Sequence, residues 1–306
     1  MRLAFLGTPE MAVPALRALV AAGHEIVLVV TRADRRRGRG SGLTPSPVKA
    51  AALELGLPVT HEIDDLLAIG ADRRPELGVV VAYGRIIKPH VLDALPMINV
   101  HFSLLPRWRG AAPVERALLA GDVETGVCIM AVEEGLDTGP VFARQAVPIA
   151  ATTTADELRG VLVEVGTALL VDVLSRPLPE PVVQSGQPTY AEKIAPGELE
   201  LDWHRSAVEL DRWIRVGGAW TTFRDKRLKV HAGTPTTEPG RPGFLAADGA
   251  TVGTGDGSLR LGVVQPEGKA AMSWADFANG AHPTPGERFG PPPRRAPHTA
   301  SESPNC

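Results

Sequence analysis

The chain has 306 residues, of which 44% are hydrophobic and 22% charged, and its net charge is −3. This length exceeds one ordinary domain and suits two, since domains usually run to about 100–200 residues. The composition is that of a globular protein, and it excludes a chain held unfolded by excess charge or one that is basic throughout. A local basic patch is still compatible with it, and a cluster of arginines provides one: Arg32, Arg35, Arg36, Arg37 and Arg39.

Cysteine usage and apolar runs bear on the compartment. The two cysteines are Cys128, in an apolar stretch, and Cys306, in a polar one, so neither a disulfide framework nor a metal site is expected. Pro, Gly or charge interrupts each apolar run before the roughly 20 residues of a membrane span, and the first residues lack a signal-peptide pattern. We expect a cytoplasmic protein with no metal and no membrane attachment. The sequence leaves the oligomeric state open, with a monomer as the working expectation.

The first half alternates strand and helix patterns. Residues 3–7 form an apolar strand candidate, 9–22 a helix that Gly23 can end, and 25–31 a second buried strand. Such a unit predicts parallel pairing with cover on both faces of the sheet. Further expected elements are helices at 46–56, 113–120 and 154–174 and strands at 78–82, 98–102, 125–132 and 140–149. Residues 1–175 should therefore form an α/β domain with a Rossmann-like, doubly wound, mostly parallel sheet.

The second half changes pattern. Residues 176–197 are dense in Pro, Gly and polar side chains and predict a linker. Beyond it we expect a helix at 206–216 and short strands at 221–223, 227–232, 250–253 and 258–264. Closely spaced short strands favour a small barrel, so residues 198–281 are expected to form an OB-like β-barrel domain. Residues 282–306, rich in Pro, Arg and Ser, predict a disordered tail.

Polar residues lie at the end of one predicted strand. Asn99 and His101 are two positions apart, so their side chains project from the same face. Ligand crevices in open α/β sheets form outside the carboxyl ends of strands, where residues 103–110 would supply a wall. Taken alone, His101 is more often a buried histidine with a satisfied hydrogen bond, and Asp137, in EEGLDTGPV, a turn residue.

As a set, the amide, imidazole and carboxylate suit acyl transfer to an amine. Donors from Asn99 and His101 could stabilise the charge that develops on a carbonyl oxygen, by about 3–4 kcal/mol for each good donor. Asp137 would favour an imidazolium, orient the ring and accept the proton that the amine loses, directly or through water. Other chemistries lack their motifs: there is no GxSxG elbow or HExxH pair, and GTPEMA lacks the later glycines of a dinucleotide fingerprint.

Two strings carry a resemblance to a known superfamily, the formyltetrahydrofolate-dependent formyltransferases: INVHFSLLPRWRGAAPVERALLAGD and the downstream EEGLDTGPV. Further strings resemble its methionyl-tRNA formyltransferase branch: LGTPE, GRGSGLTPSPVK at 38–49, YAEKI, LDW, GAWTTF, RLKV and QPEGKAAMSWADFANG. The resemblance covers the chain up to about Gly280. It implies transfer of a formyl group from 10-formyltetrahydrofolate to the amino group of methionyl initiator tRNA, as a step of translation initiation.

The resemblance also implies roles for residues. Asn99, His101 and Asp137 match the family's catalytic three. Folate contacts fall on three stretches, largely through backbone groups in the last two: Ser103, Leu104, Leu105 and Pro106, then Ile86 and Ile87, then Glu133, Gly135 and Leu136. Contacts with tRNA fall on basic residues of the loop after the second strand and of the C-terminal domain: Arg35, Arg36, Arg37, Arg39, Lys49, Arg224, Lys226, Arg227 and Lys229.

The chain departs from the family pattern in two places. The segment IRVGGAWTTF lacks the longer proline-containing stretch usual before GAW, and DRRRGRG is unusually rich in Arg. Two alternatives stay open at this point. One is a formyltransferase that acts on a sugar nucleotide or other small amine, and the other is a folate- or tRNA-binding module without catalysis.

Overall fold

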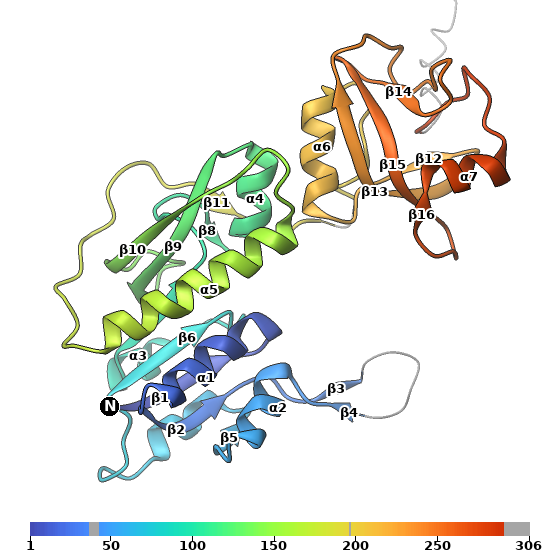
Figure 1. Ribbon diagram of the computed structural model, residues 1–306. Coiled ribbons are helices and arrows are strands. Elements are labelled where there is room, and N and C mark those ends of the chain that lie inside the picture. The colour runs from blue at the N-terminus through green and yellow to red at the C-terminus, as the bar shows by residue number, and fades with distance from the viewer. Residues whose placement is uncertain (37–42, 196, 291–306) are drawn as a thin grey trace, which may run out of the picture. The chain divides into compact units, whose positions relative to one another are not determined.

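The computed structural model describes residues 1–36, 43–195 and 197–290, and it divides after Ile194 into two compact units (Figure 1). Each unit has its own buried hydrophobic cluster. In the described part of the chain, no helix is long and apolar enough to cross a membrane.

The first unit alternates strands and helices as the sequence predicts. Its elements are β1 (Arg2–Gly7), α1 (Val13–Ala21), β2 (Glu25–Val30), β3 (Arg35–Arg36), β4 (Leu43–Thr44), α2 (Pro47–Glu54), β5 (Val59–Thr60), β6 (Leu77–Val81), α3 (Pro89–Ala94), β7 (Met97–His101), β8 (Arg109–Gly110), α4 (Pro113–Ala120), β9 (Glu124–Ala131), β10 (Val141–Pro148), α5 (Ala155–Leu174) and β11 (Tyr190–Ala191), with short 3₁₀ helices at Glu10–Ala12 and Ile63–Ala68. The sequence did not indicate α3 or the shortest strands.

The main sheet has the strand order β10-β9-β7-β6-β1-β2-β5. Strands β7, β6, β1, β2 and β5 pair in parallel, and β9 and β10 add an antiparallel edge. The parallel strands are almost wholly buried, as expected for strands covered on both faces. The expected mostly parallel, Rossmann-like sheet is confirmed.

Helix α5 fixes which face of β7 is free for chemistry. It begins at a capping box between Thr154 and Glu157, and it brings Gly166 against the sheet. A Cβ atom built on Gly166 would lie 3.1 Å from the Val100 side chain and 3.5 Å from that of Phe102. Val100 and Phe102 therefore face α5. Because side chains alternate along a strand, the residues between and before them project from the other face.

The segment expected as a linker does not run free. Residues 176–194 belong to the first unit, where Val182 forms a two-way backbone bridge with Val141 and β11 pairs in parallel with β8. The physical reason is that backbone groups of a proline-rich segment still bond to any exposed strand edge that the fold offers. The composition of the segment alone does not predict that such a strand edge is available to it.

The second unit is a curled antiparallel sheet with two helices. Its elements are α6 (Ala207–Val216), β12 (Trp220–Phe223), β13 (Lys226–Thr236), β14 (Thr251–Gly253), β15 (Ser258–Pro266), β16 (Met272–Ser273) and α7 (Trp274–Ala281). The strand order is β12-β13-β15-β14, with β16 also on β15. Irregularities of register between Val230 and Gly233 bend the long β13–β15 ladder, as a closing barrel requires. The expected OB-like fold is confirmed, although the sequence did not predict α7 or β16.

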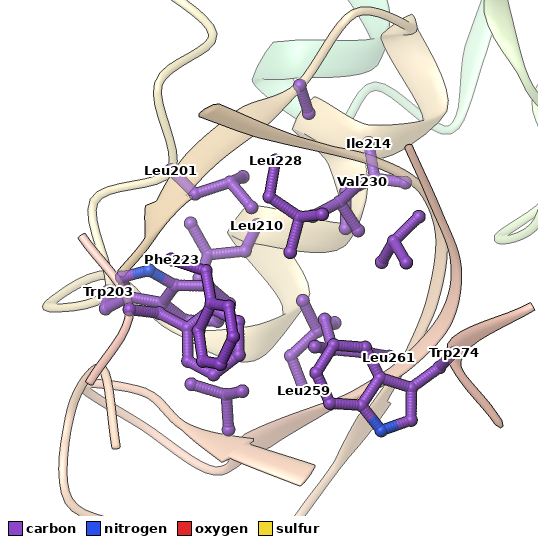
Figure 2. Close-up of a cluster of buried hydrophobic side chains, with 14 of the residues drawn as sticks. Leu201, Trp203, Leu210, Ile214, Phe223, Leu228, Val230, Leu259, Leu261 and Trp274 are labelled. Carbon is purple, nitrogen blue, oxygen red and sulfur yellow. The ribbon is translucent and has the colours of Figure 1, made fainter. Parts of the chain in front are cut away.

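The core of the second unit is aromatic and aliphatic (Figure 2), and α6 contributes Leu210 and Ile214 to it. Phe289 is 1% exposed in this core, with its ring 4.9 Å from that of Phe223 and stacked on it. The expectation of a disordered tail from residue 282 is therefore wrong for residues 282–290. A single buried aromatic anchors them, and the surrounding Pro and Gly concealed it in the sequence. Residues 291–306 lie outside the described part of the chain.

Candidate active site

The site lies at the carboxyl end of β7, on the face turned away from α5. Asn99 and His101 pair with Met130 and Cys128 of β9, and residues directly opposite in an antiparallel pair project from the same face. Cys128 and Met130 form a small buried cluster there with Leu105. Asn99 and His101 therefore lie beside buried apolar side chains. These lower the local dielectric constant and strengthen the electrostatic interactions of the two polar residues.

His101 has an oxygen atom near each of its ring nitrogens. Its Nε2 donates to the carbonyl oxygen of Trp108 at 2.9 Å, and its Nδ1 lies 3.6 Å from Oδ2 of Asp137. The imidazole is 6% exposed and the carboxylate 15%. Each ring nitrogen thus faces an acceptor, one at hydrogen-bond distance and the other at ion-pair distance. The expected approach of Asp137 to His101 is thus present.

Asp137 occupies a tight turn between β9 and β10. Its backbone has φ of +51°, in the left-handed region, and its Oδ2 accepts from the backbone N–H of Gly110 at 2.8 Å. Gly139 packs so closely that an added Cβ would lie 2.0 Å from the carbonyl oxygen of Ala131. The turn is therefore fixed by its own close packing and by the β8 backbone. Asp137 acts as a turn former and also presents its carboxylate to His101.

Residues 184–189 reinforce this arrangement from outside the main sheet. The Gln184 amide donates to the carbonyl oxygens of Asp137 and Gly139, both at 2.8 Å. Thr189 accepts at Oγ from the backbone N–H of Trp108 at 2.9 Å. Trp108 lies in the 103–110 segment that was expected to form a wall of the crevice, whereas nothing in the sequence singled out Gln184, because it belongs to no local motif.

Asn99 differs from its neighbours in having a free side chain. Among the described residues, its amide has no hydrogen-bond partner, and the residue is partly exposed. An N–H donor that no other group uses is available to an oxygen on which charge develops. His101, by contrast, already directs Nε2 at Trp108. The structure therefore distinguishes the two donors that the sequence treated alike.

Other catalytic groups fit less well. Burial raises the pKa of the Cys128 thiol above its ordinary value, which disfavours the thiolate that a covalent mechanism would need. Ser103 is fully buried, and its Oγ donates to the carbonyl oxygen of Arg107 at 2.5 Å. Its hydroxyl therefore stabilises the loop 103–107 and is not exposed to a ligand. No group of three or more His, Cys, Asp or Glu that could hold a metal ion occurs in the ranges described above.

The residues expected to contact folate fall into two groups. Ser103 and Leu105 are buried inside their loop, Leu104 and Pro106 are partly exposed, and Ile87 packs in the core. The other group is exposed and consists of Glu133, Gly135, Leu136 and Ile86. Of the two aliphatic residues in it, Leu136 is 61% exposed and Ile86 is 90% exposed. Leu136 precedes Asp137 directly, and an exposed aliphatic side chain there offers apolar surface to a ligand.

The basic residues expected to contact tRNA differ in their exposure and in their partners. Arg35 is exposed, the backbone of Arg36 pairs with Leu43, and Lys49 forms an ion pair with Asp34 at 2.8 Å. Arg37 and Arg39 lie outside the described residues. In the second unit, Lys226, Arg227 and Lys229 are exposed on β13, and Arg227 stacks over the Trp220 ring at 4.2 Å.

Arg224, also expected to contact tRNA, has partners within the protein. It pairs with Glu287 at 2.7 Å and donates to the carbonyl oxygens of Ala281 and His282. The guanidinium thereby ties residues 281–287 to the β12–β13 turn. Two of its partners, His282 and Glu287, lie in the segment that was expected to be disordered, so nothing in the sequence indicated this pairing.

Comparisons with known proteins match both units of the chain to formyl transferase domains. The family described as formyl transferase matches residues 1–174, and that described as formyl transferase, C-terminal domain, matches residues 193–282. The chain is 47% identical over 298 residues to a methionyl-tRNA formyltransferase of Roseobacter denitrificans, covering 92% of this chain and 96% of that protein. It is 44% identical over 324 residues to one of Symbiobacterium thermophilum, covering 97% of this chain and 98% of that protein.

A solved structure shares the fold at low identity. It is an N-formyltransferase from Helicobacter canadensis in complex with folinic acid and dTDP-3-aminofucose, with a TM-score of 0.66 and 18% identity. The match covers 86% of this chain and 98% of that one.

Proposed function

The chain belongs to the methionyl-tRNA formyltransferase family, and from this premise we propose that it transfers the formyl group of 10-formyltetrahydrofolate to the free amino group of methionyl initiator tRNA. The product, N-formylmethionyl-tRNA, serves translation initiation, and the proposal sets the reaction in the cytoplasm, where aminoacylated tRNA is held. Residues 1–194 would carry the chemistry, and the second unit would contribute tRNA-binding surface.

The observation that carries the proposal is the 3.6 Å approach of His101 and Asp137 on the face of β7 that also presents the unpaired Asn99 amide. In the reaction the amine nitrogen bonds to the formyl carbon, and the bond from that carbon to the folate nitrogen breaks. The folate nitrogen leaves with the bonding electron pair and takes up a proton, equivalent to the one that the amine loses. We assign to Asn99 a hydrogen bond to the formyl oxygen as charge develops there. Asp137 accepts the proton directly or through water and holds the imidazole in place.

The folate co-substrate supplies the formyl carbon. Support for its place comes from the exposed Ile86 and Leu136, which would cover the pterin ring, with backbone groups of Glu133 and Gly135 as polar contacts. Ser103, Leu104, Leu105 and Pro106 would shape the loop below it.

The direct test is an assay of purified protein with 10-formyltetrahydrofolate and methionyl initiator tRNA. We expect formylmethionyl-tRNA, and Asn99→Ala, His101→Ala and Asp137→Ala each to reduce turnover by about 10²-fold or more, since each removes a preorganised group. His204→Ala, at an exposed histidine of the second unit, is the matched control and should leave turnover within about twofold. No formylated tRNA from the unaltered protein would end the proposal.

A sugar-nucleotide amine is the second candidate acceptor, favoured by the shared fold of the Helicobacter canadensis enzyme. The near-full-length similarity to relatives named for methionyl-tRNA, and the whole second unit, favour tRNA instead. An acceptor panel that includes an amino-sugar nucleotide separates the two.

Salt dependence tests the tRNA contacts separately. Binding through Arg39 and its neighbours releases counterions from phosphates, so tRNA affinity should fall with salt more steeply than folate affinity. Arg39→Ala should flatten the slope of log K against log salt for tRNA. Equal slopes for the two ligands, or an unchanged slope in the variant, would remove this part of the proposal.

A further inference from the structure

Residues 182–191, called the strap below, cross the loops around His101 and bond to them repeatedly. Val182 bridges Val141 through two backbone hydrogen bonds, at 2.8 and 2.9 Å. At the other end β11 pairs with β8, and Gly110 lies so close that an added Cβ would be 2.8 Å from the carbonyl oxygen of Ala191. Between these anchors, one side chain reaches the turn that carries Asp137.

That side chain is Gln184, whose amide makes four hydrogen bonds. Its Nε2 donates to the carbonyl oxygens of Asp137 and Gly139, both at 2.8 Å. Its Oε1 accepts from Nη2 and Nε of Arg109, at 2.7 and 3.1 Å. An amide has two N–H donors and one oxygen with two lone pairs, so its whole capacity is used. The partners also fix its orientation, because carbonyl oxygens require the nitrogen and a guanidinium requires the oxygen.

The two carbonyl groups belong to the part of the chain that sets the Asp137 carboxylate. Asp137 has φ of +51°, a conformation that is uncommon for L residues, although Asp tolerates it better than most. Gly139 is pressed against the backbone of β9 on the far side of the turn. The turn is therefore held between β9 and Gln184. Without the amide, both carbonyl groups lose a partner and the backbone can relax toward a commoner conformation.

The strap also acts on the other side of the imidazole. Thr189 Oγ accepts from the backbone N–H of Trp108, and the carbonyl oxygen of Trp108 accepts from Nε2 of His101. Trp108 has φ of +61° and so depends on its surroundings as Asp137 does. Each ring nitrogen of His101 thus faces a group whose backbone a strap residue holds.

We infer that Gln184 is a positioning residue for formyl transfer, which fixes Asp137 against His101, and that Thr189 does the same for Trp108. The inference rests on the proposed function, because formyl transfer is the reaction that reports it. Neither side chain touches the reacting atoms in this account. They act on the geometry of groups that do, and a displacement of about 1 Å in such groups can lower turnover by about 10²-fold.

The principal test compares Gln184→Ala and the isosteric Gln184→Met with Gln187→Ala in the purified full chain. Gln187 is an exposed glutamine of the same strap, without a hydrogen-bond partner among the described residues, so its variant is the matched control. Both Gln184 variants should lower kcat about 10- to 100-fold with KM for folate and tRNA within about threefold. Gln187→Ala should stay within about twofold of the unaltered protein in kcat. A rise in KM at constant kcat would overturn the inference.

A double-variant cycle tests whether Gln184 acts through Asp137. In single-turnover assays on an Asp137→Asn background, adding Gln184→Ala should change the rate less than about twofold, because residues that act as one unit are not additive. An equal loss in both backgrounds would mean that Gln184 acts elsewhere, and the inference would fail.

Variants of Thr189 provide a second, independent test, which can be carried out even if a Gln184 variant does not fold. Thr189→Val keeps the side-chain volume and removes the hydroxyl, so kcat should fall, whereas Thr189→Ser retains the acceptor and should restore it. Equal kcat for Val and Ser overturns the role of Thr189. An unaltered protein that is inactive with both substrates refutes the proposed function; an active one with unaffected Gln184 variants refutes only the inference.

Discussion

Two segments of this chain, residues 182–191 and residues 282–290, share a composition rich in proline, glycine and polar side chains, but different forces hold them. The strap is held mainly by hydrogen bonds: Val182 and Tyr190 are 63% and 57% exposed, while backbone and amide groups bond to the catalytic loops. Residues 282–290 are held by burial of Phe289 in an aromatic core, with an ion pair at the rim.

The difference matters because the two forces have different consequences. Hydrogen bonds are directional, with a small net contribution to stability, so they set geometry more than they set the free energy of unfolding. Burial of an aromatic ring is non-directional and large, so it sets stability. Variants at the strap residues that bond to the loops around His101, Gln184 and Thr189, should therefore change turnover at nearly constant stability, and variants at Phe289 should do the reverse.

The largest expected effect is on stability, at Phe289. Phe289→Ala should lower the free energy of unfolding of the second unit by about 3–5 kcal/mol, since it empties a fully buried site. Denaturant unfolding followed by tryptophan fluorescence measures it, because Trp203 and Trp274 pack against this ring. The control Phe277→Ala, at a partly buried ring of the same cluster, should have a smaller effect. Equal losses would show that the segment is not anchored at Phe289.

Gly110→Ala should produce the next largest effect, on turnover. The residue has φ of +121°, and its new Cβ would meet the strap backbone at 2.8 Å, so the N–H that bonds to Asp137 must move. We expect a fall in kcat of about 10²-fold. Gly186→Ala, also at positive φ but with only Pro106 within 4 Å, at 3.9 Å, is the control for the backbone penalty alone. Similar kinetics for the two variants would show that the close approach of the strap backbone to Gly110 does not set turnover.

A smaller change, about 1 kcal/mol, is expected from Ser206→Ala, which removes the capping box of α6. Hydrogen bonds from the backbone and hydroxyl of Ser206 hold the pKa of Glu209 below its ordinary value of 4.5. A lowered folded-state pKa means that this stabilisation is present above pH 4.5 and is lost as pH falls through the lowered value. The stability difference between the unaltered protein and the variant should therefore narrow in acid, as urea titrations across pH 3–6 (about three units) would detect. A difference constant with pH contradicts the assignment.

The smallest effects distinguish Arg224 from the exposed lysines of β13. Lys229→Ala should reduce the salt slope of tRNA binding by about one unit without changing Tm, as loss of one phosphate contact does. Arg224→Ala should lower Tm slightly and leave the slope unchanged, because its guanidinium already bonds to Glu287, Ala281 and His282. If the two variants exchange these effects, the assignment of Arg224 to structure is wrong.

The sequence by itself determined the features that neighbouring residues encode. Continuous apolar strands and capped helices predicted the parallel sheet and the bounds of α5 closely, because strand alternation and helix caps depend on residues a few positions apart. The two-residue spacing of Asn99 and His101 put them on one face for the same reason.

Only the tertiary structure decided what distant residues do to each other. Gln184 and Arg109 are 75 positions apart, Thr189 and Trp108 are 81 apart, and Arg224 and Glu287 are 63 apart. No local periodicity or turn pattern predicts such pairs. The composition of a proline-rich segment is the same whether or not the segment contacts a strand edge or an aromatic core in the folded protein. The shared face of Asn99 and His101 was therefore visible in the sequence, whereas the groups that bond to the histidine and to its partner Trp108 became visible only in the folded structure.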